Sequence, residues 1–340
     1  MAKPSIPDAL GYMKMLTLRK IRNKGLLRLS YFLSRILKRH IHWGFPESLS
    51  IEPTSFCNLH CPECPAGNNQ LKRNRTFLSL DDYRSIIDEH DKYLIYVQLF
   101  FQGEPLLHPH FAEMVRYARQ RKIHVSTSTN AQLLTPALAE KLVTAGLNRI
   151  IISIDGTTQE VYEQYRKGGS LNLAINGLEN IVKAKKRCGS TLPFIELQFV
   201  VFRSNEHQIN DVLALGKRLG ADKVSIKTAQ LSPFASGHPS MPAQDKYSRY
   251  QKREDGTYAL KREKTFYCKR VWISAVVNAE NQLLPCCFDK SAEFPLGSLS
   301  IQRVRTITKL QTTKKFRERV WFAADKPEIC SNCTEGLKHG

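Results

Sequence analysis

The chain has 340 residues, of which 42% are hydrophobic and 24% charged, and these ordinary globular proportions exclude wholesale disorder. Its 51 Lys and Arg residues against 31 Asp and Glu give a net charge of +20, which favours anionic partners such as nucleic acid, phosphorylated metabolites or an acidic membrane surface. The absence of any apolar run of about 18 residues excludes a membrane-spanning helix, and the start lacks the pattern of a secretory signal, so we expect a cytoplasmic protein.

Residues 1–45 are predicted to form a basic helical extension. Its apolar side chains recur at helical spacing, and they are Leu26, Leu27, Leu29, Phe32, Leu33, Ile36 and Leu37. Arginine and lysine residues lie among them. One interpretation is a helix that packs its apolar stripe on the main domain and leaves a solvated basic face. The other is a surface for anionic lipid or a polyanionic partner.

Residues 46–228 alternate between strand and helix patterns. The predicted strands are 49–52, 94–101, 123–128, 149–154, 194–202 and 223–227. The predicted helices lie at about 80–90, 110–121, 135–145, 171–187 and 206–219. Alternating units of this kind form parallel sheets, and six are too few to close an eightfold barrel. We therefore expect an α/β protein with a partial, TIM-like (β/α)6 barrel.

The alternation stops after residue 228. Residues 229–266 are polar, rich in proline and charge, and are predicted to form a linker. Residues 267–340 are predicted to form a small α+β module. Within it we expect a hairpin that turns near Glu280 and Asn281, and a basic helix at about 301–320.

Three of the nine cysteines follow the first predicted strand directly, with the spacing Cys57-x3-Cys61-x2-Cys64. Three thiolates can hold three irons of a cubane cluster and leave the fourth iron open to an exogenous ligand, whereas ferredoxin-like carriers supply a fourth cysteine. Zinc would need a fourth local ligand, and His60 is poorly spaced for that purpose. The spacing therefore favours an open iron–sulfur cluster.

This spacing, after the first strand of a partial (β/α)6 barrel, resembles the signature of the radical S-adenosylmethionine (SAM) superfamily. The resemblance implies that the amino and carboxylate groups of SAM chelate the open iron. It also implies that one electron, from reduced flavodoxin or ferredoxin, cleaves SAM to methionine and a 5′-deoxyadenosyl radical that abstracts a substrate hydrogen. The residue before the third cysteine is often aromatic in this family, and here it is Glu63.

The segment after the second predicted strand, Gln102-Gly103-Glu104-Pro105, resembles the family's GGEP element with Gln in place of the first Gly. The resemblance implies that it holds the SAM amino group. The alternative is an ordinary turn with a buried salt bridge.

The loops after the third and fourth strands also resemble SAM-binding elements of the family, with Ala131 where a glycine is usual. The resemblance implies SAM contacts from Ser128, Asn130, Ser153, Asp155 and Arg166. The alternatives are turn-forming roles for Ser128, Asn130 and Asp155 and a solvated Arg166. No catalytic base is assigned.

The C-terminal cysteines resemble the SPASM or shortened Twitch module of radical SAM enzymes. The resemblance implies one auxiliary [4Fe-4S] cluster held by Cys268, Cys286, Cys330 and Cys333. Cys287 is the alternative to Cys286, because alternation along a strand lets only one of the pair face the cluster. A four-cysteine zinc site is the alternative to the cluster. Cys188 is predicted to be a bystander.

Four thiolates would saturate the auxiliary cluster and favour a role in electron transfer. We therefore predict an oxidoreductase that acts on a small polar metabolite. The alternative is a maturase that modifies a ribosomally made peptide or protein, although such enzymes often carry a longer N-terminal recognition domain. A zinc-stabilised nucleic-acid-binding protein is a third class, but the basic residues are spread out and match no base-reading module.

Overall fold

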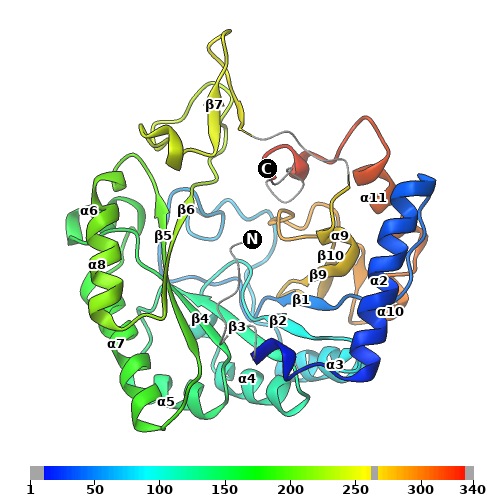
Figure 1. Cartoon of the computed structure of the whole chain (residues 1–340), viewed down its shortest axis with the longest axis horizontal. Helices are drawn as coiled ribbons and strands as arrows, with labels where there is room; N and C mark the ends of the chain where they lie inside the picture. The colour runs from blue at the N-terminus through cyan, green and yellow to red at the C-terminus, as the bar shows by residue number, and fades with distance from the viewer. Residues whose placement is uncertain (1–10, 262–266, 334–340) are drawn as a thin grey trace.

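The structure is a computed structural model, and it describes residues 11–261 and 267–333. Its centre is one curved sheet whose strands follow the order β11-β10-β9-β1-β2-β3-β4-β5-β6. The barrel strands are β1 (Ser48–Ile51), β2 (Tyr96–Gln98), β3 (His124–Thr129), β4 (Arg149–Ser153), β5 (Phe194–Val201) and β6 (Lys223–Thr228). Each of these pairs in parallel with the next. The predicted partial barrel is confirmed (Figure 1).

The helices lie on the outer side of this sheet (Figure 1). They are α3 (Leu80–His90), α4 (Phe111–Gln120), α5 (Pro136–Thr144), α6 (Gln159–Tyr165), α7 (Leu171–Arg187) and α8 (Ile209–Leu219). The Ser79 hydroxyl accepts a hydrogen bond from Asp82 N at the start of α3, and Gly220 ends α8 in a left-handed conformation. Helix α6 is not predicted from the sequence, because Tyr162 is its one buried residue and a single buried position gives no apolar pattern.

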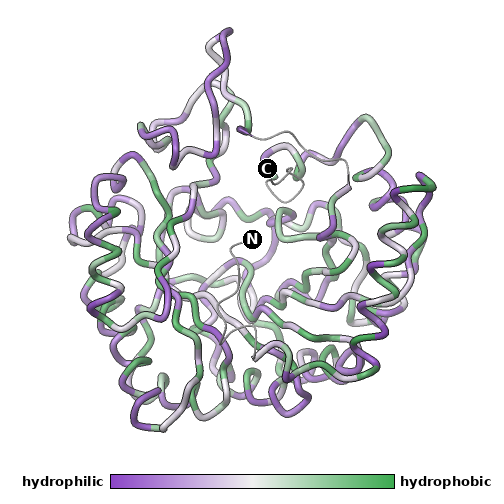
Figure 2. Tube along the Cα trace, in the orientation of Figure 1, coloured by the Kyte–Doolittle hydropathy of each residue, from purple (hydrophilic) through white to green (hydrophobic). Residues whose placement is uncertain are grey.

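Apolar residues of the strands and of the inner helix faces form one core. Ile51, Val97, Ile152 and Leu197 are fully buried between the sheet and these helices. In Figure 2 the outer helices alternate between hydrophilic and hydrophobic residues, as helices with one buried face do. Parallel strands covered by helices position loops at their carboxyl ends, and those loops carry the predicted site.

The C-terminal segment extends the same sheet. Strand β9 (Ser274–Val277) pairs in parallel with β1, and β10 (Gln282–Leu284) returns antiparallel to it and pairs with β11 (Gly297–Ser298). The hairpin turns at Asn281, which has a φ of 59°, as predicted. Helices α9 (Arg270–Ile273), α10 (Val304–Ile307) and α11 (Gln311–Trp321) complete the segment.

The segment predicted as a linker contains a hairpin of β7 (Tyr250–Lys252) and β8 (Tyr258–Leu260) that projects from the body (Figure 1). Its Tyr250 hydroxyl donates to Asn332 Oδ1 at 2.9 Å, and Asn332 Nδ2 donates to Leu231 O at 2.6 Å. These bonds fasten the segment to the loop of the last two cysteines.

Helix α2 (Leu18–Leu37) runs along the outer edge of the molecule (Figure 1). Its buried residues are Lys20, Asn23, Leu27, Ser30 and Ser34. Of the predicted apolar stripe, Leu27 alone is buried, so the interpretation that the stripe packs on the main domain is wrong. Polar side chains occupy the inner face instead, because hydrogen bonds to neighbouring segments satisfy them.

One buried ion pair connects β1 to three other segments. Glu52 is fully buried, and its Oε1 lies 2.6 Å from Nη2 of Arg73. The same carboxylate accepts hydrogen bonds from Gln102 N at 3.1 Å and from Ala279 N at 2.8 Å. Arg73 also donates from Nε to Lys290 O at 3.1 Å.

We expect Glu52→Ala to lower the free energy of unfolding by about 3–5 kcal/mol, because it leaves a buried guanidinium without its partner and two buried amides without an acceptor. The control is Lys72→Ala. It removes the neighbouring Lys72–Glu293 pair, in which the lysine side chain is 75% exposed, and should cost less than about 1 kcal/mol. Urea unfolding of both variants measures the difference, and equal losses would contradict this account.

Candidate active site

Cys57, Cys61 and Cys64 lie together in the loop after β1. Cys61 is buried and the other two are partly buried. The loop folds back on itself: Cys64 N donates to Cys61 O at 3.2 Å, and Leu59 N donates to Cys57 Sγ at 3.5 Å. A Cβ added to Gly67 would lie 2.6 Å from Cys61 N, so this position needs a glycine for the chain to pass so close.

The protein alone disfavours the thiolate form of these cysteines. Burial, with smaller contributions from the neighbouring Glu104, Cys64 and Cys61, raises the pKa of Cys57 to about 12. Burial also raises the pKa of Cys61, while Arg166 lowers it. Binding of cationic iron would overcome this cost, because thiolate ligation and deprotonation are coupled. The three cysteines of this loop lie close enough to affect one another's pKa, and they therefore fit a cluster with three protein ligands.

Arg166 connects two of the predicted elements. Its Nε and Nη2 both lie 2.6 Å from Asp155 Oδ2, and its Nη1 lies 3.9 Å from Cys61 Sγ. Burial acts to lower the pKa of Arg166, but Asp155 and Cys61 outweigh it and hold that pKa well above its ordinary value. Arg166 is thus not a solvated arginine. Asp155 itself is fully buried, and its second oxygen accepts from Val200 N at 2.6 Å.

Glu104 joins the loop after β2 to the end of β3. Its carboxylate accepts hydrogen bonds from Leu106 N at 3.1 Å, Thr129 Oγ1 at 2.7 Å and Asn130 N at 2.8 Å. A carboxylate has about four acceptor positions, so about one remains for a ligand. The adjacent Gly103 has a φ of 72°, and a Cβ there would lie 2.4 Å from Thr54 O. This glycine therefore lets the loop pack directly on the cysteine loop.

The end of β3 approaches the same loop. Asn130 donates from Nδ2 to Asn58 Oδ1 at 2.9 Å and accepts from Gln132 N at 3.0 Å. Ala131, where the family pattern has glycine, adopts a φ of 60°. Ser128 is partly exposed and Ser153 is 5% exposed. The predicted SAM-binding residues thus lie at the strand ends around the cysteines. They are residues 102–105, Ser128, Asn130, Ser153, Asp155 and Arg166. Their contacts with SAM stay predictions.

Three of the C-terminal cysteines, Cys268, Cys286 and Cys330, belong to an apolar cluster that contains two stacked indoles. Trp272 and Trp321 have ring centroids 4.1 Å apart, and Trp321 Nε1 donates to Cys268 O at 3.1 Å. Cys286, 8% exposed, belongs to the same apolar cluster, against which Cys268 and Cys330 pack. This apolar cluster excludes water from the cysteines. Burial is accordingly the main cause of the raised pKa of Cys286, and an apolar shell of this kind suits a metal group.

The adjacent cysteines have different neighbours. The charges of Cys287, Cys268 and Cys333 contribute to the raised pKa of Cys286, so Cys286 lies among the other predicted ligands. Cys287 Sγ instead accepts from Nη1 of Arg270 at 3.2 Å. These contacts support Cys286 as the ligand. No set of His, Cys, Asp or Glu among the described residues is arranged to hold a single metal ion, and a cluster spaces its ligands more widely than one ion does.

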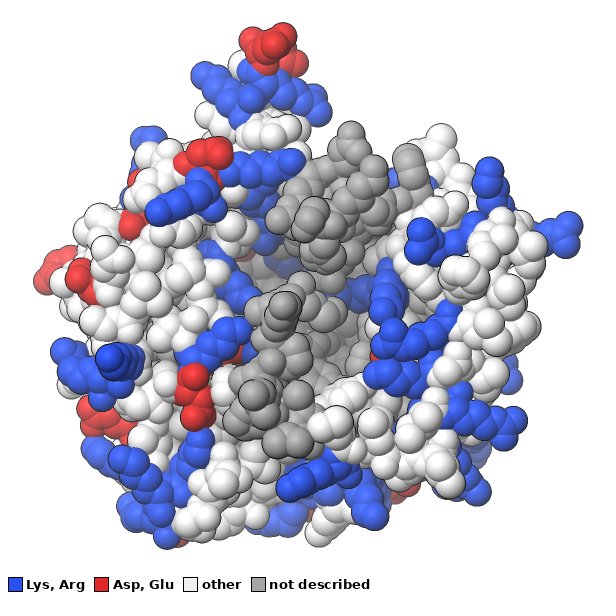
Figure 3. Space-filling model, in the orientation of Figure 1, with Lys and Arg blue, Asp and Glu red and all other residues white. Residues whose placement is uncertain are grey.

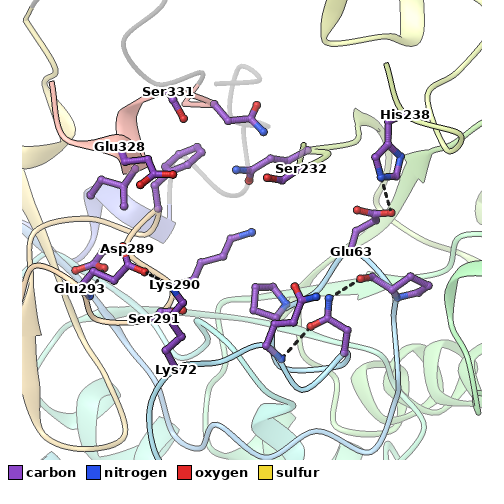
Figure 4. Close-up of a pocket in the computed structure, with 18 residues that line it drawn as sticks. Glu63, Lys72, Ser232, His238, Asp289, Lys290, Ser291, Glu293, Glu328 and Ser331 are labelled. Carbon is purple, nitrogen blue, oxygen red and sulfur yellow. Dashed lines mark hydrogen bonds and ion pairs between the residues drawn. The ribbon is translucent and has the colours of Figure 1, made fainter. Parts of the chain in front are cut away.

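A cavity of about 520 Å³ lies between the two groups of cysteines. It is lined by the cysteine loop, by the segment after β6 and by the loops around Cys287 and Cys330 (Figure 4). Glu63, which replaces the aromatic residue usual in the family, lines this cavity, and its contacts explain the replacement. Its Oε1 lies 3.6 Å from His238 Nε2 and 3.5 Å from Ser240 Oγ, so it fastens the segment after β6 to the cysteine loop.

Lys290 extends into the middle of this cavity (Figure 4). Burial lowers its pKa, while Cys64 and Cys287 raise it, so its ammonium is within electrostatic reach of both cysteine groups. Among residues 11–261 and 267–333 its ammonium has no ion-pair partner. Lys72, in the same lining, is paired with Glu293 at 3.1 Å.

The comparisons with known proteins agree with this geometry. The family profile described as "Radical SAM superfamily" matches residues 51–215, and the profile described as "Iron-sulfur cluster-binding domain", SPASM, matches residues 268–334. The chain belongs to the radical SAM superfamily. The cofactors of this radical SAM enzyme are SAM and [4Fe-4S] clusters, as the two domains imply.

Three relatives illustrate the similarity. Mycofactocin maturase MftC of Mycobacterium ulcerans is 32% identical over 192 residues, which cover 56% of this chain and 49% of the relative. AdoMet-dependent heme synthase of Methanosarcina barkeri is 31% identical over 196 residues, 57% and 53% of the two chains. SuiB of Streptococcus suis bound to SAM shares the fold with a TM-score of 0.64, 15% identity and coverage of 88% and 73%. The chain spans about half the length of the curated relatives it matches.

Sequence reasoning missed Glu52, Arg73, His238 and Lys290. An acidic residue at the end of a buried strand was a signal for Glu52, since buried carboxylates are rarely left without a partner. Lys290 follows the cysteine pair by three residues, but nothing in the sequence indicates that it points into a cavity.

We expect the reconstituted protein to hold about eight irons, and the triple variant Cys57→Ala/Cys61→Ala/Cys64→Ala to hold about four. Cys286→Ala should also lose about four irons, whereas Cys287→Ala should keep the full content. Iron and labile sulfide analysis after anaerobic reconstitution measures this, with the exposed Cys188→Ala as the control. Zinc without labile sulfide at the C-terminal site would contradict the second cluster.

Proposed function

We propose that this radical SAM enzyme modifies a ribosomally made peptide or protein, with Cys57, Cys61 and Cys64 holding the SAM cluster and Cys268, Cys286, Cys330 and Cys333 an auxiliary cluster. The observation that carries the proposal is similarity to MftC and to the PqqA peptide cyclase of Gluconobacter oxydans, which is 31% identical over 189 residues, 54% of this chain and 50% of the relative. The predicted preference for a small metabolite yields to its alternative, because it rested on the four ligands of the auxiliary cluster, which suit a peptide substrate equally well, whereas these relatives are a maturase and a peptide cyclase.

The cavity supports this proposal. Its volume of about 520 Å³ lies within the usual range of about 300–1,000 Å³ for ligand sites. It opens between the two cysteine groups, so a peptide side chain placed there would be near both.

When bound, SAM and its cluster supply a radical that removes a hydrogen atom. Four cysteine ligands leave no iron open in the auxiliary cluster, which supports electron transfer as its role. Reduced flavodoxin or ferredoxin as electron donor remains part of the proposal.

Two features of this chain would serve the substrate. Glu63 and His238 hold the segment after β6 against the cysteine loop, which narrows access of water to the cavity. Lys290 offers an ammonium without an ion-pair partner among the described residues, and a substrate carboxylate is the group that such an ammonium would bind. An acidic side chain or C-terminus of a peptide provides that carboxylate.

The test is anaerobic incubation of the reconstituted protein with SAM, dithionite and peptides encoded beside its gene. We expect a mass change in one peptide that accompanies formation of 5′-deoxyadenosine. The triple cysteine variant is the control and should form neither product. Coupling of 5′-deoxyadenosine to conversion of a small polar metabolite, with every peptide unchanged, would contradict the proposal.

We expect Lys290→Met to lower kcat/KM for the peptide by about tenfold to a hundredfold, the usual worth of a hydrogen bond to a charged group. Cleavage of SAM without peptide should stay unchanged, because Lys290 is not among the predicted ligands of SAM. Lys72→Met is the matched control, since this lysine lines the same cavity but is already paired. Equal losses in both variants would show that the charge of Lys290 has no special role.

A further inference from the structure

Helix α2 exposes the face that an ordinary surface helix buries. Its outward side chains are Leu18 (86% exposed), Ile21 (50%), Leu29 (49%), Phe32 (58%) and Ile36 (59%). At 100° per residue these positions fall on one side, opposite Leu27 and Ser34, which are fully buried. We call these five residues the outer stripe. An apolar stripe of this length on the surface marks an interaction site.

The inner face is fixed by specific contacts, so the helix cannot rotate to bury the outer stripe. Lys20 Nζ donates to Lys122 O at 2.6 Å, and Asn23 exchanges hydrogen bonds of 2.9 Å with the backbone of Phe45. Trp272 Nε1 donates to Ser30 Oγ at 3.2 Å. Turning the helix would break all of these bonds and leave buried polar groups without partners.

The charge around the outer stripe has one sign. Residues 9–46 contain no Asp or Glu, and their basic residues are Lys14, Arg19, Lys20, Arg22, Lys24, Arg28, Arg35, Lys38 and Arg39. Arg22 and Arg28 flank the outer stripe on opposite sides and are exposed. Within the described part of the chain neither forms an ion pair. Figure 3 shows Lys and Arg side chains among uncharged surface along the edge that α2 occupies.

A groove of about 590 Å³ continues this surface beside the first half of α2. Its lining includes the cations Arg19, Arg22 and Lys309 and the indole of Trp43, which is 42% exposed. Cations that surround a groove can bind phosphate groups, and tryptophan prefers the boundary between apolar and aqueous layers.

We propose that α2 docks this enzyme on an anionic lipid bilayer, with the outer stripe among the acyl chains and Arg19, Arg22 and Arg28 at the lipid phosphates. A bilayer offers an apolar layer and a layer of negative charge in one plane, which is the pattern of this face. A second copy of the chain is a poorer partner, because two such faces would bring like-charged arginine rows together. Among the described residues no helix is long and apolar enough to span the bilayer.

The experiment is sedimentation of the full chain with vesicles of phosphatidylcholine alone or with about 30% phosphatidylglycerol. We expect binding to the anionic vesicles only, and release as NaCl rises from about 0.05 to 0.5 M. Phe32→Ser/Ile36→Ser should weaken binding about tenfold or more, and Arg22→Gln/Arg28→Gln should weaken it and flatten its salt dependence.

The matched controls are Leu213→Ser/Ile301→Ser and Lys217→Gln/Arg218→Gln, which remove exposed side chains of the same kinds elsewhere. Both should bind as the unaltered chain does, and circular dichroism checks that every variant is folded. Failure to bind anionic vesicles, equal loss in the controls, or a dimer that Phe32→Ser/Ile36→Ser dissolves while vesicle binding stays unchanged would each overturn the proposal.

Discussion

The buried contact between Glu52 and Arg73 is the constraint on which the arrangement of the site loops depends. It holds the cysteine loop after β1, the loop after β2 through Gln102 N and the C-terminal hairpin through Ala279 N on one carboxylate. A buried charge is strongly destabilising when it lacks its partners, so the positions of these segments depend on one another. Since β9 also pairs with β1, the segment with the auxiliary cysteines is built onto the barrel.

Further buried contacts connect the remaining site loops of the barrel in the same way. Glu104 joins the second loop to β3, and the pair of Asp155 with Arg166 joins the ends of β4 and β5 to Cys61. Most of the predicted cofactor residues are thus held by other protein groups. The left-handed Ala131 is tolerated because Thr129 Oγ1 accepts from its amide at 2.9 Å. A rigid frame of this kind positions a cofactor without reorganisation when it binds.

The barrel and the two cysteine groups were predictable from the sequence because strand–helix periodicity and cysteine spacing are local patterns. What failed depended on contacts between distant segments. The orientation of α2 follows from Lys122, Phe45 and Trp272, none of which a helical pattern contains. Glu63 could be read as a departure from the family, but its pairing with His238 crosses 175 residues and is visible in the structure alone. The position of Lys290 in a cavity is hidden for the same reason.

The cavity shows why an unusual charge belongs there. Three of the four carboxylates along its wall are engaged: Glu63 with His238, Glu293 with Lys72, and Asp289 with the amides of Glu293 and Phe294, while Glu328 is the fourth. Lys290 has no such partner among the described residues, and partial burial makes its charge costly. The negative charges of Cys64, Cys287 and Glu63 offset part of that cost, and in the proposed function a substrate carboxylate offsets the rest. The proposed function therefore assigns recognition of the substrate to the group that pairs with Lys290.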